Sequence, residues 1–175
     1  MSLNCGVLVD YQIDNLAEAG MVAPFDRELV NPASLDVRLG SPILIESHQE
    51  GGWAPFPISE YTEEAPWLLK PNELILAPTV ELFNFPKNVC GQFFLKSSRA
   101  RDGLEHLHAG WIDAGWHGSV LTMELRNMRN LHPIKLWPGM RIGQIVFHGL
   151  STQPRFCYAK TGRYNNDTKV QGAKP

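Results

Sequence analysis

The sequence predicts an all-β barrel or sandwich with minor helix content. Short stretches in which hydrophobic and polar residues alternate recur along most of the chain. Glycine (15 residues) and proline (13 residues) are spread evenly, so turns interrupt the chain too often for long helices. The chain has 175 residues, of which 43% are hydrophobic, so it can bury a core of its own. We therefore expect a single domain over residues 1–175.

One helix is expected near the N-terminus. Asp10 is of a residue type that caps helices, and Gly20 is of the type that ends them. Apolar residues with helical spacing form a stripe in this region: Val9, Ile13, Leu16 and Ala17.

After Gly20 the hydrophobic period changes to two residues, which is typical of strands. In "SLDVRLG" the apolar residues point one way and the charged residues the other: Leu35, Val37 and Leu39 against Asp36 and Arg38. Further strands are expected in "ELILAPTVELF", "GQFFL", "SVLTMELRN", "HPIKLW" and "RIGQIVFHGL". Pro78 interrupts the first of these, so we expect a bend or a sheet edge there. Pro138-Gly139 marks a turn.

Composition excludes several classes of protein. The net charge of −2 gives no basic field for nucleic acid. The three cysteines are far apart and form no CxxC pair, so we expect neither disulfides nor a structural zinc site, and a reducing cytoplasm fits. No apolar run reaches the length of about 18 residues that a membrane span needs.

The segment "KSSRARDG" combines serines with three cations. One serine can cap a helical turn that Gly103 ends. Ser97 and Arg101 then share a face, while Lys96 and Arg99 lie on a neighbouring face. Free backbone N–H groups and cations would suit phosphate oxygens. Taken alone, a capped surface turn with solvated arginines is the simpler interpretation.

A turn in "AGWIDAGWHG" presents the carboxylate of Asp113. That carboxylate could accept a sugar hydroxyl or orient a water, or it could only stabilise an Asx-turn. Trp111 and Trp116 could stack on a base, although core packing is the more frequent use of tryptophan.

The strand "SVLTMELRN" carries one carboxylate. Its two faces are Leu121, Met123 and Leu125 against Val120, Thr122 and Glu124. A partly desolvated Glu124 would have a raised pKa and could act as base and then acid, whereas a solvent-facing Glu124 would do neither.

Three histidines lie close in sequence: His106, His108 and His117. No HxxxH motif and no HxE…PCxxC motif occurs, so we expect no zinc.

Read in order, five segments resemble dCTP deaminases, a family of the trimeric dUTPase superfamily. They are "NPASLDVRLG", "KSSRARDGL", "HAGWIDAGWHGSVLTMELRN", "PIKLWPGMRIGQIVF" and "TGRYNND", and the resemblance runs from about residue 8 to about residue 167. It implies a distorted, dUTPase-like β-barrel or jelly-roll, a homotrimer, and nucleotide sites between subunits. It also implies a hydrolase acting on a cyclic amidine C–N bond, which converts dCTP to dUTP and ammonia for pyrimidine deoxynucleotide supply.

The resemblance also implies roles for individual residues. Glu124 would be the general base and acid, Ser97 would place the water, and Arg101 would hold the geometry of the site. The nucleotide contacts that it implies are Lys96, Ser98, Arg99 and Ala100 for the triphosphate, Asp113 for the sugar, the backbone of Thr122 and Met123 for the base, and Tyr158, Arg163 and Asp167 in the tail. Mg²⁺ would be bound through the triphosphate. Residues 159–175, which are polar and aperiodic and by pattern alone read as a frayed end, would form a flexible lid.

Three questions stay open at this point. Asp167 stands where many relatives have a phosphate-binding glutamine, so either Gln171 takes that part or Asp167 binds Mg²⁺. His108 replaces a threonine in a loop one residue shorter than in relatives, which leaves feedback by dTTP open. Asp113 could activate a water against the α-phosphate, giving a bifunctional deaminase/pyrophosphatase or a dUTP pyrophosphatase. After the deaminase and the pyrophosphatase or bifunctional enzyme, a non-catalytic nucleotide-binding module is the third functional alternative.

Overall fold

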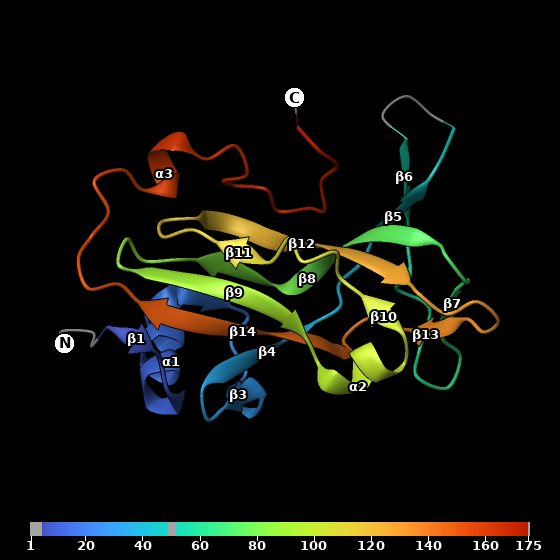
Figure 1. Cartoon of the computed structure of the whole chain (residues 1–175), viewed down its shortest axis with the longest axis horizontal. Helices are drawn as coiled ribbons and strands as arrows, with labels where there is room; N and C mark the ends of the chain where they lie inside the picture. Colours follow the sequence, from blue (N-terminus) through green and yellow to red (C-terminus); the bar gives the residue numbers. More distant parts are fainter. Residues whose placement is uncertain (1–4, 49–51, 175) are drawn as a thin grey trace.

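A computed structural model describes residues 5–48 and 52–174 of the chain, and it shows two six-stranded antiparallel sheets (Figure 1). The first sheet has the order β11 (Trp111–Ile112), β9 (Val89–Leu95), β14 (Arg141–Gly149), β4 (Ser34–Arg38), β3 (Val30–Asn31), with β1 (Gly6–Val7) on β14. The second has the order β10 (Leu104–Glu105), β12 (His117–Asn127), β8 (Leu74–Asn84), β5 (Ile43–Glu46), β6 (Trp53–Phe56), with β2 (Val22–Ala23) on β8. A separate pair is β7 (Trp67–Leu69) with β13 (Ile134–Leu136). The all-β prediction is confirmed.

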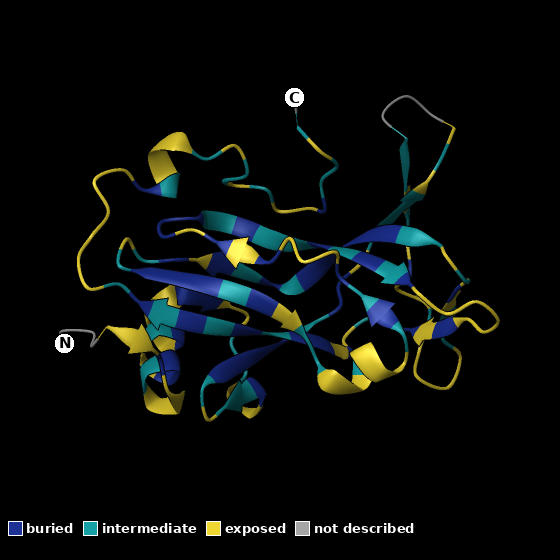
Figure 2. Ribbon diagram, viewed as in Figure 1, coloured by how far each residue is buried: buried dark blue, intermediate teal, exposed yellow. Residues whose placement is uncertain are grey.

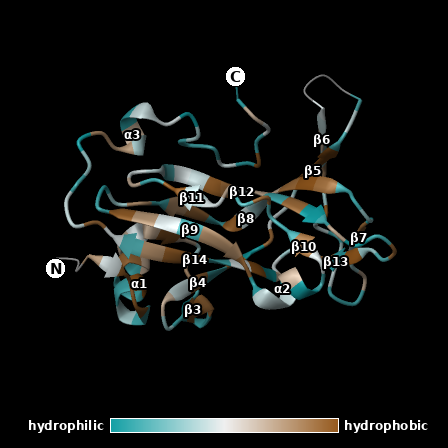
Figure 3. Ribbon diagram, in the orientation of Figure 1, coloured by the Kyte–Doolittle hydropathy of each residue, from teal (hydrophilic) through white to brown (hydrophobic). Residues whose placement is uncertain are grey.

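The two sheets share one hydrophobic core, and a bridge between Leu39 and Thr79 joins them. Residues that point inward from both sheets are less than 2% exposed, among them Leu35, Val37, Phe83, Met123, Leu125, Ile145 and Phe147. Hydrophobic residues follow strands such as β5, β9 and β14 (Figure 3), and more than half of the residues of β9 and β14 are buried (Figure 2). Burial of this strand-derived apolar surface is the main force that holds the sheets together.

The helices are short: α1 (Asp10–Leu16), the π-helical turn η1 (Ala17–Met21), the 3₁₀ turn η2 (Arg27–Leu29), α2 (Ser97–Arg101) and α3 (Tyr158–Thr161). The predicted N-terminal helix is present and ends at Gly20, whose φ of +96° favours glycine. The N-cap is Val9 and not Asp10, because the carboxylate of Asp10 accepts from the N–H of its neighbour Tyr11. No helix within the described residues is long and apolar enough to cross a membrane.

Pro78 marks a bend and not a sheet edge. Strand β8 is continuous through this position and lies between β12 and β5. Opposite Pro78 the register of β12 shifts between Val120 and Thr122, and the N–H of Leu121 donates to the hydroxyl of Thr79 at 3.0 Å. This irregularity leaves Leu121 half-buried, whereas simple alternation placed it on the core face.

The C-terminal segment lies along β12 (Figure 1). Asn166 donates its N–H to the carbonyl of His117, and Val120 donates its N–H to the carbonyl of Asp167, both at 3.0 Å. Val170 is buried. Residues 158–174 are therefore docked on the sheet, and the frayed end that the pattern alone predicted is wrong for them.

Candidate active site

A cavity of about 520 Å³ lies between β12, the turn after β11 and the docked C-terminal segment. Its apolar walls come from both sheets and the tail: Trp53, Leu74, Leu76, Ala109, Trp111, Ile112, Trp116, Val120, Leu121, Gly172 and Ala173. Its polar groups are Asp113, Thr122, Glu124, Tyr158, Tyr164, Asp167 and Gln171. A concave, mostly apolar pocket with a few polar groups is the usual form of a small-molecule site.

Glu124 is a half-buried carboxylate of this cavity, and unlike Asp167 it has no ion pair among the described residues. It stands near the centre of β12, opposite Leu76 of β8, and its neighbours Met123 and Leu125 point into the core. Burial raises the pKa of Glu124 above its ordinary value, against a backbone hydrogen bond that lowers it. A carboxyl group with a raised pKa can accept a proton and return it, which is what general acid–base catalysis requires.

Asp113 lies at the turn that follows β11. The turn closes with a hydrogen bond from the N–H of Trp116 to the carbonyl of Asp113 at 3.2 Å, and Gly115 takes a φ of +85°. The indole of Trp111 donates to the Asp113 carboxylate at 3.1 Å. That carboxylate is exposed toward the cavity, so it can meet a polar group of a ligand.

Trp116 belongs to the core as well as to the cavity wall. It is 7% exposed and stacks on Phe83 with ring centroids 5.9 Å apart. Its indole donates to the carbonyl of Tyr164 at 2.7 Å, which ties the tail to the sheet. Core packing, the more frequent use expected from sequence, is confirmed for Trp116, while Trp111 is 60% exposed.

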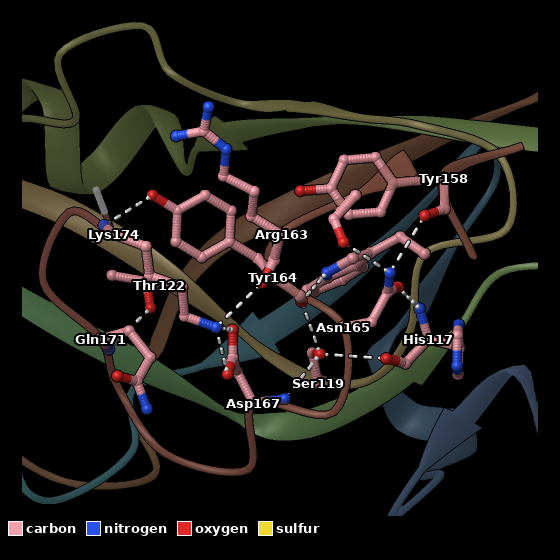
Figure 4. Close-up of polar contacts among 12 residues, drawn as sticks. His117, Ser119, Thr122, Tyr158, Arg163, Tyr164, Asn165, Asp167, Gln171 and Lys174 are labelled. Atoms are coloured by element: carbon pink, nitrogen blue, oxygen red, sulfur yellow. Dashed lines mark hydrogen bonds and ion pairs between the residues drawn. The ribbon is translucent and has the colours of Figure 1, made fainter. Parts of the chain in front are cut away.

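An ion pair between Lys174 and Asp167 links two parts of the C-terminal segment beside the cavity (Figure 4). Lys174 donates to both carboxylate oxygens of Asp167 at 2.7 Å and lies over the ring of Tyr164. Next to it, the N–H of Gln171 donates to the hydroxyl of Thr122 at 3.3 Å. Lys174 thus neutralises Asp167, which would otherwise repel a phosphate at this position.

The structure brings together only part of the predicted site. Five predicted residues line the cavity: Asp113, Thr122, Glu124, Tyr158 and Asp167. The others do not line it: Lys96, Ser97, Ser98, Arg99, Ala100 and Arg101 lie on or next to α2, Met123 is in the core, and Arg163 is exposed. Helix α2 is a mostly exposed element at the lower edge of the molecule as drawn in Figures 1 and 2.

Within the cavity, every charged side chain among the described lining residues is acidic. An anionic ligand such as a triphosphate needs cations, and the predicted cations stand on α2. Lys96 is the N-cap residue of this helix, so the capping serine predicted from sequence is not observed. Ser97 and Arg101 lie on the same face of α2, and both are exposed. This exposure leaves them accessible to a ligand outside their own chain's cavity.

Lys96 is engaged within its own chain. Its ammonium donates to both carboxylate oxygens of Asp36 at 2.7 and 2.6 Å, and Asp36 is 1% exposed. The amide of Asn31 adds a hydrogen bond of 2.8 Å, and the guanidinium of Arg141 lies 3.7 Å away. The alternation in β4 therefore directs Asp36 into a buried ion pair that fixes the start of α2.

We expect Lys96→Met to lower the free energy of unfolding by about 3 kcal/mol, because it leaves the Asp36 charge buried without its main partner. Chemical denaturation measures this change. Lys135→Met, at an exposed lysine of β13, is the matched control and should change little. The double variant Lys96→Met/Asp36→Asn should recover most of the loss. A cost of Lys96→Met equal to that of the control would contradict this role.

Sequence reasoning missed several cavity residues. Trp53 comes from β6, outside every motif singled out in the sequence, and nothing in its local pattern marks it. Leu74 and Leu76 are ordinary strand residues that the fold turns toward Glu124. Tyr164 stands in the quoted "TGRYNND" segment and could have been found there.

Comparison with known proteins places the chain in a family. Residues 7–150 match the dCTP deaminase-like family. A protein of Pseudarthrobacter chlorophenolicus named "dCTP deaminase, dUMP-forming" is 37% identical over 163 residues, covering 88% of this chain and 83% of that protein.

Two solved structures share the fold. The 2'-deoxycytidine 5'-triphosphate deaminase of Agrobacterium tumefaciens has a TM-score of 0.70 at 22% identity, covering 84% of this chain, which spans about half (49%) of that crystallised chain. The dUTPase of Streptococcus mutans has a TM-score of 0.50 at 17% identity, covering 74% of this chain and 92% of that one. The predicted dUTPase-like fold, a distorted barrel, is confirmed.

Proposed function

We propose, from the premise that this chain belongs to the dCTP deaminase-like family, that it hydrolyses dCTP to dUMP, ammonia and pyrophosphate. The chain is an enzyme of the deaminase type, a hydrolase. From sequence alone dUTP is the expected product, with the bifunctional reaction as an alternative. The names of relatives that are 36–38% identical, all "dUMP-forming", favour that alternative. The observation that carries the proposal is the half-buried Glu124 in a cavity that also holds Asp113.

Glu124 performs the deamination. Its carboxylate takes a proton from water, and the resulting hydroxide attacks C4 of cytosine. The proton passes to N3. Glu124 then takes the proton of the new C4 hydroxyl as the C4 carbonyl forms and gives it to the amino group, which leaves as ammonia. A raised pKa suits this residue because it must both accept and donate protons.

Asp113 serves the second step. Its exposed carboxylate accepts a proton from a water that attacks the α-phosphorus, and pyrophosphate leaves with the oxygen of the broken P–O bond. Mg²⁺ bound by the phosphate oxygens would neutralise the charge of the leaving group. No protein cage for that ion is proposed, and Asp167 is already paired with Lys174.

The triphosphate is bound by a second copy of the chain. The cavity supplies only acidic charges among its described lining residues, while Arg99 and Arg101 stand on an exposed α2 outside it. We therefore place the α2 of a neighbouring subunit at each cavity, in the homotrimer that the family resemblance implies. Ser97 and Arg101 would then reach Glu124 across the subunit boundary.

Product analysis by anion exchange tests the reaction. With dCTP and Mg²⁺, we expect dUMP, pyrophosphate and ammonia in equal amounts, with no accumulation of free dUTP. Accumulation of dUTP as the final product would show that the enzyme only deaminates dCTP and does not release pyrophosphate. Consumption of dUTP with dCTP untouched would overturn deamination, and tight binding of dCTP without turnover would indicate a binding module.

A further inference from the structure

Three potential metal ligands gather where β10 ends and the loop to β11 begins. Glu105, His106 and His108 each offer one ligand atom, and these three atoms lie within 4.8 Å of one another. Oε1 of Glu105 is 3.9 Å from Nε2 of His108, and the two imidazole rings are 5.3 Å apart between centroids. From sequence we grouped these histidines with His117, but in the structure their partner is Glu105.

The chain is shaped to bring these groups together. Leu107 and His108 both take positive φ, +55° and +58°, which folds the loop back so that His108 stands beside His106. The carboxylate of Glu105 accepts from the N–H of His106 at 2.7 Å, so its position is fixed before any ligand arrives. Of the three groups, Glu105 and His106 are thus held in place, and His108 is the one that can move.

His106 is the fixed imidazole of the cluster. It is 8% exposed, and its ring meets Phe93 edge to face at 5.2 Å. A ring held in this way keeps a nitrogen in a fixed place, and imidazole nitrogen is a common ligand of zinc-type metals.

We propose that Glu105, His106 and His108 bind a divalent transition metal of the zinc type, with the fourth position taken by water. One carboxylate and two imidazoles match the ligands that Zn²⁺ and Co²⁺ accept, whereas Mg²⁺ prefers oxygen ligands. Tetrahedral ligands at about 2.0 Å from a zinc ion lie about 3.3 Å apart. The His108 side chain is 85% exposed and can rotate to close the remaining distance.

The metal would fix one wall of the cavity. Ala109 follows His108 directly and lines the cavity, and β11 with Asp113 comes next along the chain. On the other side, Glu105 pairs across the sheet with Arg126, two residues from Glu124. The ion would therefore order the loop that leads into β11 and Asp113, without taking part in the proposed reaction.

Metal titration of the untagged, EDTA-treated full chain tests this site. Zn²⁺ in calorimetry, and Co²⁺ followed by its visible absorption, should each bind once per chain, and Mg²⁺ should not produce either signal. Removing an outer partner of a metal ligand costs 10–100-fold in affinity, so removing a ligand should cost at least about 100-fold. We expect this loss in His108→Ala and in Glu105→Gln, neither of which disturbs a buried ring.

The control is His132→Ala, at an exposed histidine outside the cluster, which should bind like the wild type. Hydrogen exchange of residues 106–112 should slow with Zn²⁺ in the wild type and in this control, and not in His108→Ala. Absence of binding in the wild type, or binding that survives both His108→Ala and Glu105→Gln, would overturn the site. Neither result depends on whether dCTP is the substrate.

Discussion

Glu124→Gln is expected to lower kcat for dCTP deamination by about 1,000-fold, because the amide keeps the shape of the side chain but cannot accept the proton of the attacking water. Affinity for dCTP should stay within a few-fold of the wild type, since the walls of the cavity are unchanged. Stopped assays of ammonia release, with equilibrium binding of dCTP in parallel, separate the two effects. A variant that keeps turnover near the wild-type rate would remove Glu124 from the mechanism.

The same variant should be more stable than the wild type at mildly alkaline pH. The pKa of Glu124 is raised in the folded protein, so the folded state binds the proton more tightly than the unfolded state does. The stability that this residue contributes is therefore complete at acid pH, and it is lost as pH rises through the raised pKa. Glutamine carries no charge at any pH, so the advantage of Glu124→Gln should vanish at acid pH. Thermal unfolding across this range also shows whether the inactive variant is folded.

Asp113→Asn is the matched variant for the second step. Deamination should continue in it, and dUTP should accumulate because the water at the α-phosphorus has lost its base. Loss of both steps would show that Asp113 positions the nucleotide for the whole site. The two carboxylates lie in one cavity, so only separate product analysis distinguishes their roles.

The strands could be predicted because hydrophobic alternation is a local property. The sequence predicted β4, β12 and β14 correctly, and it put Met123 and Leu125 on one face of β12 and Glu124 on the other; in the structure the first two are buried and Glu124 lines the cavity. Leu121 was assigned to the face of Met123, and it does pack against the core, but next to a register shift in the ladder to β8 it is only half-buried and also lines the cavity. Such shifts depend on the partner strand, which local pattern does not reveal.

The residues of the site could be predicted only where they lie together in one segment of the sequence. Asp113 and Glu124 belong to one continuous motif-rich stretch, and both line the cavity. Trp53 enters through contacts over long sequence distances, and the pairing of Lys96 with Asp36 depends on how β4 lies beside the start of α2. The expectation that Lys96 binds phosphate stays a prediction. In the structure Lys96 is paired with Asp36, so Lys96 would have to leave this ion pair, or share its charge, to bind a phosphate.

Arg101→Ala and Glu124→Gln homomers should each be nearly inactive, yet mixed assemblies of the two should recover activity. The proposed site takes Glu124 from one subunit and Arg101 from the α2 of another, since α2 does not line its own chain's cavity. In a cyclic trimer that contains both variants, about one third of the sites then combine two intact halves. Co-expression from two differently tagged genes, followed by assay of doubly purified protein, measures this recovery.

The pairing of Glu124→Gln with the double variant Glu124→Gln/Arg101→Ala contains no intact carboxylate and should recover nothing. Arg129→Ala, an exposed arginine beyond the end of β12, should be active alone and serves as the control for loss of a surface cation. If mixing restores no activity although mixed assemblies form, Arg101 acts on the cavity of its own chain. The α2 segment would then have to move from the position it has in this structure, and the shared site would be wrong.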